Sequence, residues 1–226
     1  MRLMPTGTPE HAGDLFADLE PACARQEICP GAVVLRRHAL TAEHLLFEVL
    51  REIETRAPFR HMVTPGGFRM SVAMTNCGAY GWVSDRTGYR YDSRDPESGL
   101  PWPALSKTFL SLARDAATAA GFIDFEPDAC LINRYAPGTK LSLHQDKDER
   151  DFSAPIVSVS LGLPAVFLFG GARRTDKCLR VPLAHGDVVG WGGPARRHYH
   201  GVLPLADGEH FLAGRVRLNL TLRKAR

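Results

Sequence analysis

The stretch KLSLHQDKDE, residues 140–149, decides how the second half of the chain is expected to fold. Its apolar residues Leu141 and Leu143 alternate with the polar residues Ser142, His144 and Asp146. Successive side chains of a β-strand point to opposite faces, so this pattern predicts a strand with one apolar and one polar face. The polar face would place an imidazole beside a carboxylate, which is the beginning of a metal site.

Short apolar runs separated by Gly and Pro fill the rest of the chain after residue 128 and predict further strands. These runs are ACLINRY, PIVSVSLG, AVFLFG, CLRVPLAHGDVVGWG, GVLPL and RVRLNLTLR. An earlier strand is predicted over GAVVLRRHAL (31–40), and residues 1–30 are expected to be a loosely ordered, variable lead-in.

Two helices are predicted in the first half of the chain. The segment 41–56 has Thr41 as its expected N-cap and an apolar stripe formed by Leu45, Leu46, Val49, Leu50 and Ile53. The segment 106–121 has Ser106 to cap it and Gly121 to end it. Early helices and late strands predict an α+β, mainly β fold, with helices packed against an antiparallel sandwich or barrel.

The length and composition restrict the class of protein. A chain of 226 residues that is 44% hydrophobic fits one domain with a real core, and a formal net charge of +3 permits an anionic partner without demanding one. The five cysteines are scattered, which argues against a disulfide framework or a zinc ribbon. Without an apolar signal-peptide core or a run near ~20 apolar residues, we expect a soluble cytoplasmic protein that does not enter a membrane.

A third metal ligand should come from a histidine on a distant strand. His198 and His200 would lie on the same strand face, so their spacing does not choose between them. The apolar strand after His200 favours a buried position, whereas two arginines precede His198. His185 and Asp187 form another His-x-Asp pair, but the glycine between them indicates a turn.

Two histidines and one carboxylate with open coordination positions suit non-haem Fe(II) oxygen chemistry, although zinc hydrolases use similar ligands. The strand RVRLNLTLR (215–223) adds a second clue, because Arg215, Arg217, Asn219 and Arg223 share one face. That face is either a solvated basic surface or an anion site, since arginines bind carboxylates through paired hydrogen bonds. A dicarboxylate such as 2-oxoglutarate would fit the second interpretation.

Together these segments resemble the AlkB family of Fe(II)/2-oxoglutarate-dependent dioxygenases. The resemblance covers roughly residues 14–223, including DLFADLEP near the start. Its motifs are MVTPGG (62–67), MSVAMTNCG (70–78), PDACLINRYAPG (127–138), KLSLHQDKDE (140–149), APIVSVSLGLPA (154–165), HGDVVGWGG (185–193), YHG (199–201) and RLNLTLR (217–223).

The resemblance implies a double-stranded β-helix (jelly-roll) core over residues 104–226. It also implies a nucleotide-recognition region with a supporting helix over 31–103, the two forming one compact, monomeric unit. It implies that iron is bound by His144, Asp146 and His200. The implied residues for 2-oxoglutarate are Asn133, Arg134, Tyr135, Arg217, Asn219 and Arg223, with Arg215 left out.

The resemblance further implies oxidative demethylation of bases such as 1-methyladenine and 3-methylcytosine, in single- or double-stranded DNA and also in RNA. O₂ and 2-oxoglutarate would be consumed, and formaldehyde, succinate and CO₂ released. Such lesions are cationic and cannot pair, so they are easily flipped into a pocket and favour aromatic rings and a carboxylate. The implied substrate residues are Trp82, Tyr89, Tyr91, Asp148, Arg174, Thr64, Met70 and Lys147.

Three alternatives remain open from the sequence. The nearest is an Fe(II)/2-oxoglutarate oxygenase that acts on a protein side chain or a small molecule. The others are a non-catalytic nucleic-acid-binding jelly roll, which would not need three metal ligands, and a zinc hydrolase, for which the arginine pair would have no role.

Overall fold

The computed structural model describes residues 24–226. Residues 1–23, including DLFADLEP, lie outside the described part of the chain. The helical elements are η1 (Leu40–Ala42), α1 (Glu43–Arg56), α2 (Lys107–Ala120) and η2 (Gly193–Ala195). The strands are β1 (Arg25–Cys29), β2 (Ala32–Leu35), β3 (Ala73–Gly78), β4 (Gly81–Asp85), β5 (Gly88–Asp92), β6 (Ala129–Tyr135), β7 (Leu141–His144), β8 (Ile156–Gly162), β9 (Ala165–Phe169), β10 (Leu179–Leu183), β11 (Val188–Trp191), β12 (His200–Val202) and β13 (Arg217–Arg223).

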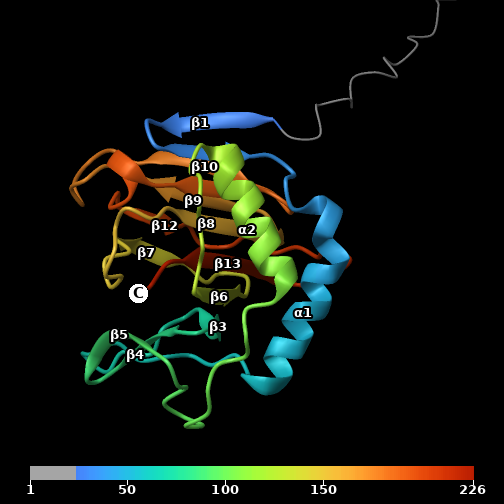
Figure 1. The fold of residues 1–226 in the computed structure, drawn as a ribbon, viewed down its shortest axis with the longest axis vertical. Helices are drawn as coiled ribbons and strands as arrows, with labels where there is room; N and C mark the ends of the chain where they lie inside the picture. The colour runs from blue at the N-terminus through green and yellow to red at the C-terminus, as the bar shows by residue number, and fades with distance from the viewer. Residues whose placement is uncertain (1–23) are drawn as a thin grey trace, which may run out of the picture.

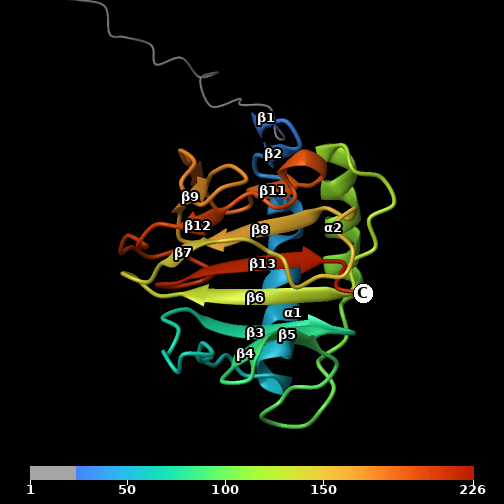
Figure 2. The same cartoon turned by 90° about the vertical axis from the view of Figure 1, so that its left-hand side faces the viewer.

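Two antiparallel sheets and a helical layer make up the fold. The large sheet has the strand order β1-β2-β11-β8-β13-β6-β3, and the small sheet has the order β10-β9-β12-β7. Figure 1 shows α1 and α2 on one side of the large sheet and the small sheet on the other, and Figure 2 shows the helices behind the strands. One apolar cluster fills the space between helices and large sheet, and a second lies between the two sheets. The predicted mainly β, α+β class is confirmed.

The helix α2 begins and ends where the sequence predicts. The Ser106 side chain accepts a hydrogen bond from the backbone N–H of Phe109, and Gly121 adopts the left-handed conformation with φ +96°. An N-cap side chain satisfies one of the N–H groups that have no partner within the helix, and glycine adopts positive φ without a steric penalty. Both signals are local, which is why the sequence was sufficient here.

The helix α1 differs in detail from the prediction. Thr41 lies inside the short η1 turn, and Ala42 precedes α1 without a side-chain cap, so the predicted N-cap is wrong. Leu45 is 55% exposed, whereas Phe47 is buried with Leu46, Leu50 and Ile53. The buried face of α1 therefore includes Phe47 and excludes Leu45.

The N-terminal strands also differ from the prediction. Residues 25–29, predicted as loosely ordered, form β1 and pair with β2 at the edge of the large sheet. The strand predicted over 31–40 ends at residue 35 and is followed by turns. The large sheet also crosses the predicted boundary at residue 103, because β2 and β3 pair with β11 and β6. The predicted recognition role of residues 31–103 stays a prediction.

The His-x-Asp pair at residues 185–187 lies in a turn between β10 and β11, as predicted. His185 pairs with Glu43 of α1 at 2.7 Å, and Asp187 pairs with Arg36 at 2.7 Å. The two side chains therefore support the packing of the N-terminal segments and lie apart from the other histidines of the predicted metal site.

A third, two-stranded sheet is formed by the hairpin β4–β5. Its strands follow β3 directly, so the hairpin lies below the large sheet in Figure 1, at the end occupied by β3. Asn76 of β3 donates to the backbone carbonyl of Trp82 at 3.0 Å and accepts from the Trp82 backbone N–H at 3.0 Å. This amide fixes the start of the hairpin to the sheet. Within residues 24–226, no helix is long and apolar enough to span a lipid bilayer.

Replacing Ser106 by Ala should lower the free energy of unfolding by about 1 kcal/mol, since it removes the cap of α2 without changing the buried face of the helix. Urea denaturation followed by circular dichroism measures the change. Ser111→Ala, on the exposed side of the same helix, is the matched control and should leave stability nearly unchanged. Equal stability of Ser106→Ala and the unchanged protein would contradict the capping role.

Candidate metal and 2-oxoglutarate site

His144, Asp146 and His200 come together at the small sheet. His200 of β12 is directly opposite His144 of β7, and Asp146 follows β7 by two residues. The Nε2 atoms of His144 and His200 lie 3.7 Å and 3.6 Å from the Asp146 carboxylate oxygens. Possible ligand atoms of the three residues all lie within 4.8 Å of one another. The strand pairing therefore selects His200, while the His198 side chain lies against Phe169.

Backbone hydrogen bonds fix the tautomer of both histidines. The Nδ1 atoms of His144 and His200 lie 3.0 Å from the carbonyl oxygens of Ser142 and His198. A carbonyl can only accept, so each Nδ1 carries the hydrogen and each Nε2 is left free to bind a metal. Burial and the neighbouring His144 lower the pKa of His200 to about 4, so its imidazole is neutral near pH 7, as a metal ligand requires.

The Asp146 carboxylate is held ionised by an arginine. Arg223 donates to its Oδ2 from Nε at 3.1 Å and from Nη2 at 2.7 Å, and both residues are buried. Burial opposes ionisation, but Arg223 and the two histidines bring the pKa of Asp146 well below its usual range. A metal bonded at about 2.1 Å holds neighbouring ligand atoms about 3 Å apart, so small rotations would bring the three side chains onto one ion. The residues therefore fit a facial triad.

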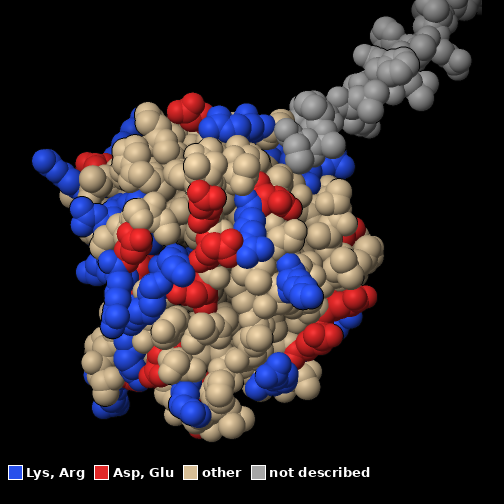
Figure 3. All heavy atoms as spheres, viewed as in Figure 1, with Lys and Arg blue, Asp and Glu red and all other residues tan. Residues whose placement is uncertain are grey.

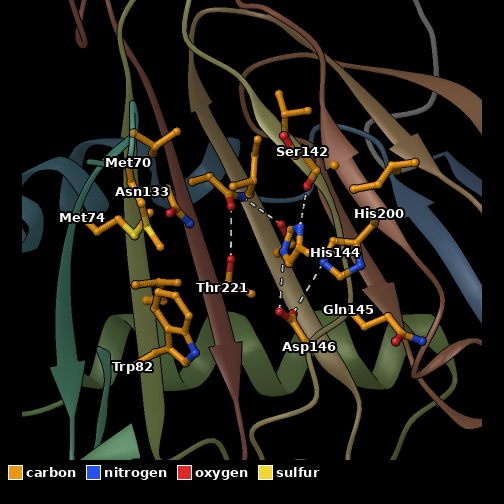
Figure 4. A pocket seen from close by; sticks show the side chains of 18 of the residues that line it. Met70, Met74, Trp82, Asn133, Ser142, His144, Gln145, Asp146, His200 and Thr221 are labelled. Carbon is orange, nitrogen blue, oxygen red and sulfur yellow. Dashed lines mark hydrogen bonds and ion pairs between the residues drawn. The ribbon is translucent and has the colours of Figure 1, made fainter. Parts of the chain in front are cut away.

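A cavity of about 550 Å³ extends from these ligands between the two sheets. Arg217 and Asn219 of β13 lie directly opposite Tyr135 and Asn133 of β6, so the four side chains share the face that lines the cavity. Figure 4 shows Asn133 and Thr221 beside the cavity, near the His-Asp-His cluster.

Several buried polar atoms of Arg217 and its neighbours have no hydrogen-bond partner within residues 24–226. Nε and Nη1 of Arg217, the Tyr135 hydroxyl and Oδ1 of Asn133 are all without a hydrogen bond, while Nη2 of Arg217 donates to Ser160. A buried guanidinium with two free donor nitrogens is costly unless an anion binds to it. The donor set therefore fits a carboxylate-containing co-substrate.

Two residues predicted to bind ligands are placed elsewhere. Arg134 alternates with Asn133 and Tyr135 along β6, so it points away from the cavity, where it pairs with Glu54 of α1 at 2.6 Å and lies over Phe59. It cannot reach the co-substrate space. Tyr91 is only 7% exposed and donates to Glu149 at 2.7 Å, which places it beneath the cavity lining.

The other predicted substrate residues line the mouth of the cavity. They are Thr64, Met70, Trp82, Tyr89, Lys147, Asp148 and Arg174. The Trp82 ring is stacked on Tyr89 with ring centres 5.7 Å apart, and its Nε1 donates to Asp148 at 2.8 Å. Arg174 is held by the carbonyl of Leu143 at 2.8 Å.

Several residues that matter to the site were not singled out from the sequence. Ser158 and Ser160 of β8 hold Asn219 and Arg217 by hydrogen bonds of 2.8 Å and 2.9 Å. They could have been found, because they are alternate polar positions in the apolar run PIVSVSLG. Met74 and Trp191 also line the cavity, but nothing distinguishes them in the sequence from ordinary core residues.

A family model described as the 2OG-Fe(II) oxygenase superfamily matches residues 31–223. The chain belongs to this superfamily. It is 59% identical over 212 residues to "Alpha-ketoglutarate-dependent dioxygenase AlkB" of Salmonella typhimurium, covering 94% of this chain and 97% of the relative. The protein of the same name from Escherichia coli is 58% identical with the same coverage.

A more distant relative and a solved structure agree with this assignment. "tRNA demethylase abh1" of Schizosaccharomyces pombe is 32% identical over 64% of this chain and 52% of that protein. The solved structure of OsALKBH1 matches with a TM-score of 0.78 and 29% identity, covering 89% of this chain and all of that one. The predicted jelly-roll core is confirmed.

The chain is therefore an Fe(II)- and 2-oxoglutarate-dependent dioxygenase, with O₂ as its other substrate. His144, Asp146 and His200 form its metal site. Membership in this superfamily argues against the zinc hydrolase and the non-catalytic jelly roll considered from the sequence.

Asp146→Ala should abolish tight metal binding, because a facial triad that lacks its carboxylate holds iron poorly and Arg223 would lose its two hydrogen bonds to Asp146. Titration of the metal-free protein with Mn(II), followed by electron paramagnetic resonance, measures the loss, and circular dichroism checks the fold. His185→Gln changes the histidine of the other His-x-Asp pair and is the control that should keep the affinity. Tight binding by Asp146→Ala would refute the metal assignment.

Proposed function

We propose that this dioxygenase removes methyl groups from alkylated nucleic-acid bases such as 1-methyladenine and 3-methylcytosine. The observation that carries the proposal is the arrangement in Figure 4, where Trp82 lies across the cavity from His144 and Asp146. A planar base could enter between the indole and the imidazole, which would bring its N-methyl group toward the metal ligands. Relatives named as AlkB dioxygenases and as a tRNA demethylase support this substrate class.

The surroundings of Trp82 suit a cationic base. Its Nε1 is held by the Asp148 carboxylate, so that negative charge lies at the edge of the proposed base site. A methylated adenine or cytosine ring carries positive charge, which favours both an aromatic face and a nearby carboxylate. Tyr89 is stacked on Trp82 and would help to keep the indole oriented.

Basic side chains near the cavity would bind the phosphate backbone. Lys140, Lys147 and Arg174 line the cavity, and Arg86 lies in the tip of the β4–β5 hairpin. Figure 3 shows Lys and Arg side chains gathered along the edge that carries the small sheet and the hairpin in Figure 1. Phosphate contacts of this kind make affinity fall as salt concentration rises. The proposal covers both DNA and RNA, in single-stranded form or with the lesion flipped out of a duplex.

The residues of the chain would divide the chemistry as follows. His144, Asp146 and His200 would hold Fe(II), which together with 2-oxoglutarate and O₂ supplies the oxidising power to hydroxylate an N-methyl group. Arg217, Tyr135 and Asn133 would bind the far carboxylate of 2-oxoglutarate, with Asn219 and Arg223 on the same strand nearer to the metal. The hydroxymethyl product loses formaldehyde and leaves the unmodified base, while 2-oxoglutarate leaves as succinate and CO₂.

A single-stranded oligonucleotide containing 1-methyladenine should lose the mass of its methyl group when incubated with the enzyme, Fe(II), 2-oxoglutarate and O₂. Mass spectrometry measures the loss, and omission of each component in turn is the control. Methyl loss that does not require all three would contradict the proposal. Succinate formation without methyl loss would also contradict it, and would favour an oxygenase for a protein side chain or a small molecule.

Arg217→Ala should raise the KM for 2-oxoglutarate about 30-fold or more, since losing one partner of a buried charge pair costs roughly 2–5 kcal/mol. Steady-state succinate production at varied 2-oxoglutarate measures it. Arg215→Ala is the matched control, because Arg215 is 66% exposed in its side chain and pairs with Asp207 outside the cavity. An unchanged KM in Arg217→Ala would remove the proposed carboxylate anchor.

A further inference from the structure

Glu149 is a buried acid that neither the metal site nor the proposed base site uses. Its side chain is 2% exposed, although it follows the exposed loop position Lys147 and the half-buried Asp148. Tyr91 donates to its Oε1 at 2.7 Å, and Nε of Arg223 lies 3.5 Å from the same oxygen. Nη2 of Arg196 lies 3.3 Å from Oε2. A buried carboxylate with this many partners requires an explanation.

The partners of Glu149 come from three separate parts of the fold. Tyr91 belongs to β5 of the hairpin, Arg223 is the last residue of β13, and Arg196 follows η2. Arg196 also donates to the backbone carbonyls of Asp146 at 3.1 Å and Ala154 at 2.9 Å. Arg196 thus holds both ends of the loop that carries Glu149.

The charges in this network balance. As whole residues, Asp146 and Glu149 are 9% and 6% exposed, and the two arginines Arg196 and Arg223 are 3% and 5% exposed. Two buried acids face two buried bases, so removing any one of them would leave an uncompensated charge. Arg223 touches both acids, and its Nη1 also donates to the Tyr91 hydroxyl at 3.4 Å. The contacts with Glu149 and Tyr91 orient the Arg223 guanidinium, and the guanidinium in turn orients Asp146.

We propose that Glu149 and Tyr91 are positioning residues that hold Arg223 so that Asp146 presents its carboxylate to iron. The same contacts attach the β4–β5 hairpin, which carries Trp82, to the metal centre. The inference rests on the proposed placement of iron and substrate, but it concerns metal affinity and can be tested without any nucleic acid. In this proposal Tyr91 acts through Arg223, whereas the family resemblance implied that it contacts the nucleotide.

Tyr91→Phe and Glu149→Gln are the variants that test the proposal. Each metal-free protein is titrated with Mn(II), followed by electron paramagnetic resonance, and its thermal unfolding is recorded by circular dichroism. Direct partners of metal ligands typically change affinity 10–100-fold, so we expect a loss of roughly threefold to tenfold for residues one contact further away. Tyr80→Phe is the matched control, because Arg226 lies over the rings of both Tyr80 and Tyr91, but Tyr80 belongs to the segment before the hairpin, and this variant should keep the affinity.

Metal affinity unchanged in both variants, with only a lower unfolding temperature, would show a purely structural role and overturn the proposal. Glu149→Gln removes a buried charge and could fail to fold, in which case Tyr91→Phe, which keeps all four charges, decides. Weaker Mn(II) binding together with an absence of methyl loss from the unchanged enzyme would retain this inference and reject the nucleic-acid substrate. If the unchanged enzyme removes the methyl group but both variants bind Mn(II) normally, the nucleic-acid substrate is retained and the positioning role of Glu149 and Tyr91 is rejected.

Discussion

The structure of the site depends on the ion pair between Asp146 and Arg223. An ionised carboxylate that is 9% exposed could not persist in an apolar interior without a partner, and Arg223 supplies two hydrogen bonds to a single oxygen. The pair joins the loop after β7, in the small sheet, to the end of β13 in the large sheet. It therefore fixes the distance between the two sheets at the point where the metal binds. The other carboxylate oxygen remains available to a cation.

The register of β13 gives this ion pair its place. Arg217, Asn219, Thr221 and Arg223 face the cavity, while Leu218, Leu220 and Leu222 pack against the helical layer. β13 pairs with β6 on one side and β8 on the other over nearly its whole length. A slip by one residue would bury the arginines under the helices and expose the leucines to the cavity, at a prohibitive cost. The apolar core thus selects the register that brings both arginines to the site.

Local patterns predicted the parts of the site that lie on one strand. Alternation gathered the polar residues of β13 on one face, as the structure shows. It also predicted His144 and Asp146 on one strand face; the two side chains do lie together, but β7 ends at His144 and Asp146 is placed by the loop that follows. The same rule, applied strictly, excludes Arg134, because it alternates with Asn133 and Tyr135; including it followed the family resemblance and neglected the strand period. Local patterns could not place residues whose position depends on pairing with a strand that is distant in the sequence. Spacing did not choose between His198 and His200; the family resemblance implied His200, and the pairing of β12 with β7 places it opposite His144.

One wrong prediction and one feature that the sequence did not reveal both arise from tertiary contacts. The β1 sequence RQEIC has little apolar character, and its residues 25–27 are exposed. It forms a strand because the edge of β2 offers backbone hydrogen bonds. Tyr91 and Glu149 look like surface residues in the sequence. They are buried because the hairpin, β13 and the loop after β7 meet around them. The sequence of one segment cannot predict contacts among three distant segments, whereas the capping residues of α2 lie next to the helix and can be recognised from the local sequence.

The five residues from Gln145 to Glu149 connect the metal to the proposed base site through successive side chains that point in different directions. Asp146 turns to the histidines and Arg223, Asp148 holds the Trp82 indole, and Glu149 turns inward to Tyr91. Both sites are therefore built on one short loop, and Arg196 anchors that loop through its backbone. A shift of the hairpin would move Trp82 and Tyr91 together, and through them Asp148 and Glu149. The proposed base site and the metal carboxylate are therefore joined by one short loop, with no long chain of contacts through the core between them.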